Sequence, residues 1–160
     1  MRAGRRRRAN VIVDTNLLLV LLVGALDPDH IARFKRTKAY TRDDYFLLVS
    51  FIGKFKQILT TPNVLTEVSN LMGQLSDPLL HRTRTSLARL AQDAREQYLP
   101  SKELVLDPNF AVLGLADASI AHAAGTDVTV LTADLPLYQR LSSAGHDVIN
   151  FNHLRSGSWQ

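Results

Sequence analysis

The sequence predicts an α/β fold built around a mainly parallel sheet. Short β-branched apolar runs, such as residues 11–13, alternate with longer segments whose apolar residues recur at helical spacing. The chain has 160 residues, of which 46% are hydrophobic, and this suffices for one domain with a buried core. Strands that alternate with helices favour a parallel sheet with right-handed crossovers.

Composition excludes several classes of protein. The chain contains no cysteine, so disulfides and thiolate metal sites are excluded and a reducing, cytoplasmic location is expected. Residues 17–23 are far fewer than the roughly 20 apolar residues that cross a membrane, so no membrane partner is expected. Asp14 interrupts the apolar run that follows the basic start, so no signal-peptide core forms there. The net charge of +4 favours a polyanionic partner.

Three regions are expected along the chain. Residues 1–9 contain five arginines and no apolar cluster, which predicts a basic flexible tail. This tail either contacts nucleic acid or a partner, or is simply a solvated terminus. Residues 10–152 form the folded domain, and residues 153–160 form a polar tail.

Residues that start or stop helices delimit the elements of the first half. Asp27-Pro28-Asp29 ends the first helix, and Thr61-Pro62 starts a later one, with Thr as the N-cap and Pro at the first helical position. That later helix carries one apolar stripe. The predicted elements are, in order, a strand at 10–13, helices at 15–25, 30–38 and 42–53, a strand at 55–59 and a helix at 61–75.

The second half repeats these signals. Asp77-Pro78 starts another helix, and Gly125 and Gly145 each close one. The predicted elements are a helix at 78–98, a short strand at 103–106, a helix at 113–124, a strand at 128–131, a helix at 135–143 and a strand at 148–151.

A basic window with interleaved aromatic residues occupies residues 33–42. Basic and aromatic side chains together suit phosphates and unstacked bases, so this window is predicted to bind nucleic acid. The alternative is an amphipathic helix with a solvated basic face. The candidate nucleic-acid-binding residues are Arg33, Lys35, Arg36 and Lys38.

Two acidic residues follow predicted strands. Asp14 comes directly after the first strand, and Asp134 comes three residues after the strand at 128–131. In open α/β sheets, ligands bind at the edge formed by the carboxyl ends of the strands. Each of these residues is therefore a helix N-cap, a functional group or both.

Two more acids lie on predicted helices. Asp117 shares a helical face with Leu113 and Ile120, and this apolar face is expected to pack on the sheet. An unpaired ionised carboxylate there is costly, and no Lys or Arg lies on the same stripe, so Asp117 either binds metal or is a hydrogen-bonded structural acid. Glu67 borders the apolar stripe of its own helix, within about a turn of Leu71.

If these helices pack on one edge of the sheet, four acids converge there. Clustered carboxylates repel one another unless a cation lies between them. Ligation by oxygen alone indicates a hard ion, Mg²⁺ or Mn²⁺. Such ions clamp the attacking and leaving oxygens in phosphodiester cleavage, which also suits a basic chain.

At this point the sequence resembles the PIN-domain ribonucleases, and within them the VapC-type toxins of bacterial and archaeal toxin–antitoxin systems. The resemblance covers about residues 10–152, and it depends on four weak motifs that occur in this order and at about these separations. The motifs are Val11-Ile12-Val13-Asp14-Thr15-Asn16, residues 61–68 with Leu65-Thr66-Glu67-Val68, Leu115-Ala116-Asp117-Ala118-Ser119-Ile120, and Leu131-Thr132-Ala133-Asp134.

The resemblance implies a three-layer α/β/α fold with a five-stranded parallel sheet in the order 3-2-1-4-5, and metal-dependent endoribonuclease activity. It implies RNA as substrate, and an antitoxin protein and a second copy of the chain as partners. The stretch between the first two motifs is longer than in compact toxins, so a nuclease without an antitoxin is the other interpretation. By motif match, Asp14, Glu67, Asp117 and Asp134 would be the catalytic, metal-binding acids, and Asn16 and Thr132 would orient acids or water.

Two other functions compete with this one. An aspartyl phospho-acceptor domain also places an Asp after its first strand, but the phosphatase class needs a second Asp where Asn16 stands, and a receiver needs an acidic pair that residues 1–10 lack. A non-catalytic scaffold of the same fold, binding nucleic acid or an antitoxin, is the second competitor. Dependence on metal would separate such a scaffold from an enzyme.

Overall fold

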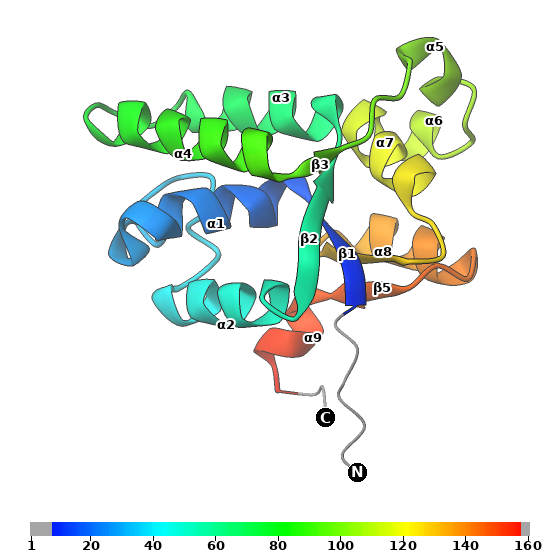
Figure 1. Ribbon diagram of the computed structural model, residues 1–160. Coiled ribbons are helices and arrows are strands. Elements are labelled where there is room, and N and C mark those ends of the chain that lie inside the picture. Colours follow the sequence, from blue (N-terminus) through cyan, green and yellow to red (C-terminus); the bar gives the residue numbers. More distant parts are fainter. Residues whose placement is uncertain (1–7, 158–160) are drawn as a thin grey trace.

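A computed structural model describes residues 8–157, in which five parallel strands form one sheet in the order β3-β2-β1-β4-β5 (Figure 1). The predicted α/β class, the parallel sheet and the strand order are thereby confirmed. Residues 1–7 of the expected basic tail and residues 158–160 of the expected polar tail lie outside the described residues. The strands are β1 (Arg8–Val13), β2 (Phe55–Thr60), β3 (Arg95–Glu96), β4 (Val128–Thr132) and β5 (Val148–Asn150).

Helices cover both faces of the sheet. Figure 1 shows α3, α4 and α7 on one side of the strands and α2 and α9 on the other, which gives three layers. In the described part of the chain, none of the helices is both long and apolar enough to cross a membrane. The helices are α1 (Thr15–Leu26), the 3-10 turn η1 (Pro28–His30), α2 (Arg42–Ile52), α3 (Pro62–Met72), α4 (Leu79–Asp93), α5 (Ser101–Leu104), α6 (Phe110–Leu113), α7 (Leu115–Ala123), α8 (Leu135–Ser143) and α9 (Phe151–Arg155).

Strand β1 is the centre of the sheet. Its residues Val11, Ile12 and Val13 are at most 1% exposed, as expected for a continuous apolar run covered on both faces. Ile12 pairs with Leu59 of β2 on one side and with Val130 of β4 on the other. The carboxyl ends of these three strands therefore lie side by side, and a helix starts shortly after each of them.

The segment between η1 and α2 corrects the predicted helix at 30–38. Residues 31–39 form successive turns, in which Thr37 N donates to Phe34 O and Tyr40 N donates to Thr37 O. The buried residues recur every third position, at Ile31, Phe34, Thr37 and Tyr40, and this spacing suits three-residue turns rather than the 3.6-residue period of a helix. The hydroxyl of Thr37 also donates to Ile31 O at 2.7 Å. Residues 31–41 are called the basic segment below.

The third strand also differs from the prediction. The predicted strand at 103–106 is wrong, because Ser101–Leu104 is helix α5, and the predicted helix at 78–98 ends at Asp93. The strand β3 is only two residues long, and it pairs its Arg95 and Glu96 with the end of β2. Both side chains are exposed, so no apolar periodicity could have indicated a strand there.

Two helix boundaries also differ from the predictions. The helix predicted at 113–124 begins at Leu115, because Gly114 has a φ of 82°, a conformation that favours glycine and ends α6. Asp117 consequently lies in the first turn of α7. Phe151, expected to end a strand, is the first residue of α9, and this helix continues to Arg155 within the segment expected to be a polar tail.

Candidate functional site

Asp14, at the end of β1, is fixed by three hydrogen bonds. Its Oδ1 accepts from the backbone N of Leu17 at 3.0 Å and so caps α1. Its Oδ2 accepts from Thr132 Oγ1 at 2.5 Å and from the backbone N of Ala133 at 2.9 Å. Asp14 is 4% exposed, and this burial raises its pKa despite the three hydrogen bonds, which lower it. The negative charge of Asp134 raises the pKa of Asp14 further.

Asp134 is the exposed N-cap of α8. Its Oδ1 accepts from the backbone N of Leu137 at 2.9 Å, which confirms the capping role. Its own backbone N donates to Thr132 Oγ1 at 3.0 Å. The hydroxyl of Thr132 therefore connects the carboxylate of Asp14 to the backbone of Asp134.

Glu67 and Asp117 come from α3 and α7, two helices that pack against each other. A buried hydrogen bond of 2.7 Å between the hydroxyls of Thr61 and Ser119 joins the start of α3 to α7. Ser119 donates its own hydrogen to Ala116 O at 2.6 Å, so the hydroxyl of Thr61 is left as the donor to Ser119. This bond fixes the positions of the two helices that carry the acids.

The four acids share one electrostatic environment. Burial raises the pKa of Asp117 to about 7, and the charges of Asp134, Asp14 and Glu67 add to that effect. Burial and then the charge of Asp14 raise the pKa of Glu67. The charges of the other three acids, which come from separate parts of the chain, thus all act on Asp117. Asp117 is half-buried in the first turn of α7, and Ile120 and Ala121, three and four positions later on the same helical face, are buried.

The acids converge without forming a complete ligand set. Among residues 8–157, no group of three or more His, Asp or Glu side chains has the arrangement of a metal site. The side chains of Glu67 and Asp117 have no hydrogen-bond or ion-pair partner within the same range. Asn16 is exposed and makes no hydrogen bond to the acids in the part of the chain described.

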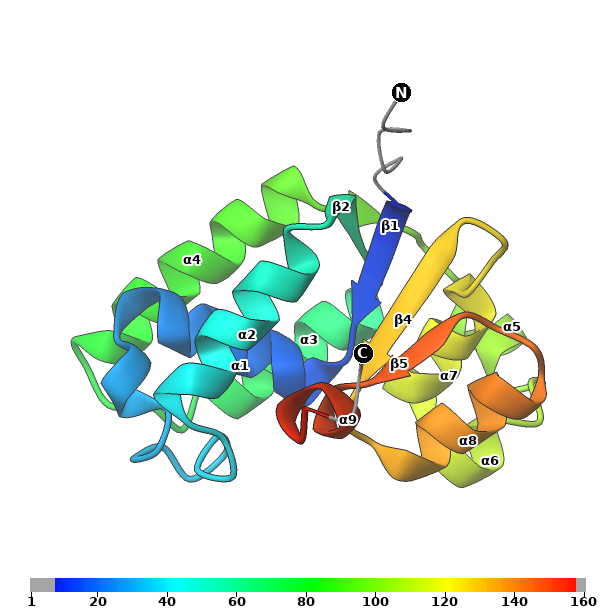
Figure 2. The same ribbon diagram turned by 90° about the horizontal axis from the view of Figure 1, so that it is seen from below.

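The four basic candidates lie on the exposed positions of the basic segment, between its buried residues. Figure 2 shows this segment, between α1 and α2, at the same end of the molecule as α9 and the carboxyl ends of β1, β4 and β5. Arg36 also contacts another part of the fold, because its Nε donates to Gln74 Oε1 at 3.0 Å. The segment and the acids therefore occupy the same end of the fold.

Nothing matches when the sequence is compared with models of protein families and with curated proteins. The chemistry of the chain is therefore inferred from the geometry of its own residues.

Two further residues lie near this edge of the sheet, and neither was predicted as a site residue. Tyr40, one of the aromatic residues interleaved in the basic window, is 9% exposed and packs its ring against that of Phe151 with centroids 6.2 Å apart, so it is buried rather than presented to a base. Burial and then the charge of Asp14 raise the pKa of Tyr40 to about 12, so its phenol remains protonated at neutral pH. The second residue is Arg155, whose guanidinium lies 4.9 Å from the centre of the Tyr40 ring. An N-cap signal at Asn150 could have indicated the helix that carries Arg155.

Proposed function

We propose that this protein is a metal-dependent endoribonuclease of the PIN type, which hydrolyses RNA phosphodiester bonds with Mg²⁺ or Mn²⁺. One arrangement carries the proposal: Asp14 and Asp134 follow β1 and β4 at the carboxyl edge of the parallel sheet, and the packed helices α3 and α7 carry two further acids. The charges of the other three acids raise the pKa of Asp117. The fold alone would not support a function, since α/β sheets of this kind serve many activities.

The chemistry of the donor set fits a hard divalent cation. Every candidate ligand is a carboxylate oxygen, which is the donor that Mg²⁺ and Mn²⁺ prefer. The charges of Asp134, Asp14 and Glu67 disfavour ionisation of Asp117, and a cation between them would relieve this repulsion. Each carboxylate oxygen can accept more than one hydrogen bond, so Oδ1 of Asp14 retains a lone pair beside the bond from Leu17.

Asp14, Glu67, Asp117 and Asp134 would hold the ion. When bound, such an ion stabilises charge on a phosphate and lowers the pKa of a water molecule. The chain supplies the positions of these groups. Thr132 and the backbone of Ala133 orient the carboxylate of Asp14. The exposed cations of the basic segment would bind the RNA backbone by neutralising phosphates.

A role as the toxin of a toxin–antitoxin pair, in the cytoplasm, is part of the proposal. The four motifs that resemble VapC-type toxins support it, and the absence of cysteine is compatible with a reducing compartment. An antitoxin protein and a second copy of the chain would be its partners. A neighbouring short gene that encodes a DNA-binding protein would support this role, and a gene without such a neighbour would favour a nuclease that acts alone.

RNA cleavage by the purified protein tests the proposal directly. We expect cleavage of single-stranded RNA with Mg²⁺ or Mn²⁺, none in EDTA, and none by an Asp14→Asn variant purified in the same way, which controls for contaminating nucleases. Metal-dependent binding without cleavage would instead support a non-catalytic scaffold. Transfer of phosphate from acetyl phosphate to Asp14 would support a phospho-acceptor domain.

A further inference from the structure

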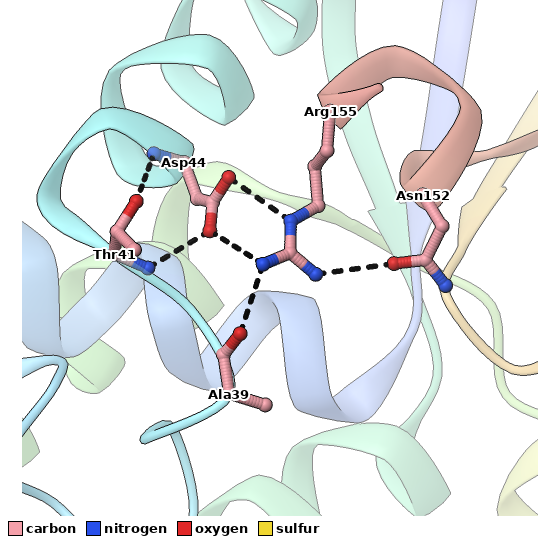
Figure 3. Close-up of polar contacts among 5 residues, drawn as sticks. All are labelled: Ala39, Thr41, Asp44, Asn152 and Arg155. Atoms are coloured by element: carbon pink, nitrogen blue, oxygen red, sulfur yellow. Dashed lines mark hydrogen bonds and ion pairs between the residues drawn. The ribbon is translucent and has the colours of Figure 1, made fainter.

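Arg155, in the last turn of α9, contacts Asp44 and Ala39, which lie 111 and 116 positions earlier in the sequence, and Asn152 of its own helix (Figure 3). Its Nε donates to Asp44 Oδ1 at 3.0 Å, and one terminal nitrogen lies 2.9 Å from Asp44 Oδ2 and donates to Ala39 O at 2.9 Å. The other terminal nitrogen donates to Asn152 Oδ1 at 3.2 Å. The guanidinium thus pairs with Asp44 through two parallel contacts, a geometry that lysine cannot reproduce.

On one side, Arg155 holds the end of the basic segment. Asp44 Oδ2 also accepts from the backbone N of Thr41 at 2.8 Å, and Thr41 Oγ1 accepts from the backbone N of Asp44, which forms the capping box that starts α2. Arg155 therefore binds the residue that fixes where the basic segment ends. The contact with Ala39 O and the stacking on Tyr40 extend this attachment into the segment itself.

On the other side, α9 contacts the residues that orient Asp14. Asn152 Nδ2 donates to Ala133 O at 3.5 Å, and Ala133 N donates to Asp14 Oδ2. Phe151 packs against the ring of Tyr40 from the first turn of α9. The helix therefore connects the basic segment to the ends of the strands that carry the acids.

Burial makes the pair between Arg155 and Asp44 different from an ordinary surface ion pair. The two side chains are 29% and 11% exposed. The exposed pair between Arg42 and Asp29 has side chains 53% and 63% exposed, and such pairs contribute little. Arg42 therefore provides a control for the loss of one positive charge next to the same segment.

We propose that Arg155 is a positioning residue for RNA cleavage: it holds the basic segment in one position relative to Asp14, so that RNA bound to the segment reaches the acids in one register. The inference rests on the proposed nuclease function. Its physical basis is that a displacement of about 1 Å between bound substrate and reacting groups can lower a rate about 100-fold. Arg155 need not touch RNA for this role.

The test compares Arg155→Gln, Arg155→Lys, Asp44→Asn and the double variant Arg155→Gln/Asp44→Asn with the parent and with Arg42→Gln. Cleavage of one defined RNA with Mg²⁺ is measured at a temperature at which circular dichroism shows every variant folded. We expect Arg155→Gln and Arg155→Lys to lower kcat/KM about 10- to 100-fold and to spread cleavage over neighbouring bonds. The double variant should lose no more than the single variants, because both substitutions break the same pair.

Amide hydrogen exchange of residues 31–41 provides a readout that does not need activity. Exchange there should rise in Arg155→Gln and remain at the parent level in Arg42→Gln. If the parent protein does not cleave RNA, the proposed function is wrong. Independently of that result, an amide exchange rate of residues 31–41 that is unchanged in Arg155→Gln would contradict the positioning role. If the parent cleaves RNA and Arg155→Gln keeps the kcat/KM and cleavage pattern of Arg42→Gln, the positioning role is wrong.

Discussion

The hydroxyl of Thr132 donates a hydrogen bond of 2.5 Å to Oδ2 of Asp14, across 118 positions of the sequence. The same hydroxyl oxygen accepts a hydrogen bond from the backbone N of Asp134 at 3.0 Å. One side chain thus orients the acid at the end of β1 and the turn that carries the acid after β4. It donates to one of these groups and accepts from the other, so only a hydroxyl residue fits this position.

Thr132→Val should therefore impair cleavage more than it impairs folding. Valine keeps the shape of the side chain but removes both hydrogen bonds, so we expect kcat/KM to fall at least about tenfold. Stability should fall by about 1–3 kcal/mol. Thr129→Val is the matched control, because Thr129 is also buried on β4 and its hydroxyl donates to Asp147 at 2.6 Å, away from the acids. Equal losses of activity in the two variants would contradict the role of Thr132.

Asp117→Asn should separate stability from activity. It removes one of four mutually repelling charges at nearly constant volume, so the melting temperature in EDTA should be kept or raised. Cleavage should fall by orders of magnitude, and Mg²⁺ should no longer raise the melting temperature as it does in the parent. Calorimetry with and without Mg²⁺, beside a cleavage assay, measures both effects.

The exposed Asp127, near the start of β4, provides the control for this substitution. Asp127→Asn also removes one negative charge, but it should change neither the cleavage rate nor the effect of Mg²⁺ on melting. An Asp117→Asn protein that is destabilised yet active would show that Asp117 is a structural acid.

The raised pKa of Asp117 predicts how stability depends on pH without metal. Its folded-state pKa of about 7 lies above its ordinary value of 3.8, so the folded state binds the proton more tightly than the unfolded state. The stabilisation from this proton is complete below about pH 4 and is lost as the pH rises through about 7. Melting temperatures in EDTA should therefore decline over that window, and the decline should be smaller in Asp117→Asn. If the melting temperature falls with pH equally in the parent protein and in Asp117→Asn, the pKa of Asp117 is not raised.

The basic segment should contribute to binding more than to chemistry. Replacing Arg33, Lys35, Arg36 and Lys38 with Gln should weaken RNA binding and flatten its dependence on salt, because fewer counterions are released. Single-turnover cleavage at saturating RNA should change little. Replacing four exposed arginines of α4 and β3 (Arg82, Arg84, Arg89 and Arg95) removes the same charge elsewhere and should affect binding less. A rate that saturating RNA cannot restore would place the segment in the active site.

Metal selectivity should follow the hardness of the donors. Carboxylate oxygens suit six-coordinate Mg²⁺ and Mn²⁺, whereas Zn²⁺ prefers nitrogen and sulfur ligands and four-coordination. Cleavage should accordingly be strong with Mg²⁺ or Mn²⁺ and weak with Zn²⁺. Full cleavage in EDTA would show that the reaction needs no metal. A mechanism based on His122 or His153 would then have to be tested.

The parts of the fold that were predicted correctly depend on local apolar patterns. The run Val11–Val13 is buried on both faces, and the helix after it is apolar nearly all round, so both were evident from composition alone. Strand β3 was not predictable in this way, because it exists only through pairing with the end of β2. The turns of the basic segment were missed because a spacing of three is close to the helical period over a short stretch.

In the candidate site, too, local features could be predicted from the sequence and contacts between distant elements could not. The acids could be proposed because each stands at a strand end or a helix stripe, which are local features. The hydroxyl pair of Thr61 and Ser119 and the contacts of Arg155 join elements that are distant in sequence, and no spacing indicates them. Gly114, which precedes Leu115, is a local signal for the start of α7.

The central position of β1 has a consequence for the order of folding. β1 is the first described strand, but one of its two neighbours is β4, which comes late in the chain. Before β4 docks, one edge of β1 has no partner strand, and Asp14 lacks two of its three hydrogen-bond donors. Such non-local pairings have a high contact order and form slowly. A nascent chain that has not yet reached residue 132 therefore lacks the arrangement proposed to cut RNA, so activity should appear only after nearly the whole domain has been synthesised.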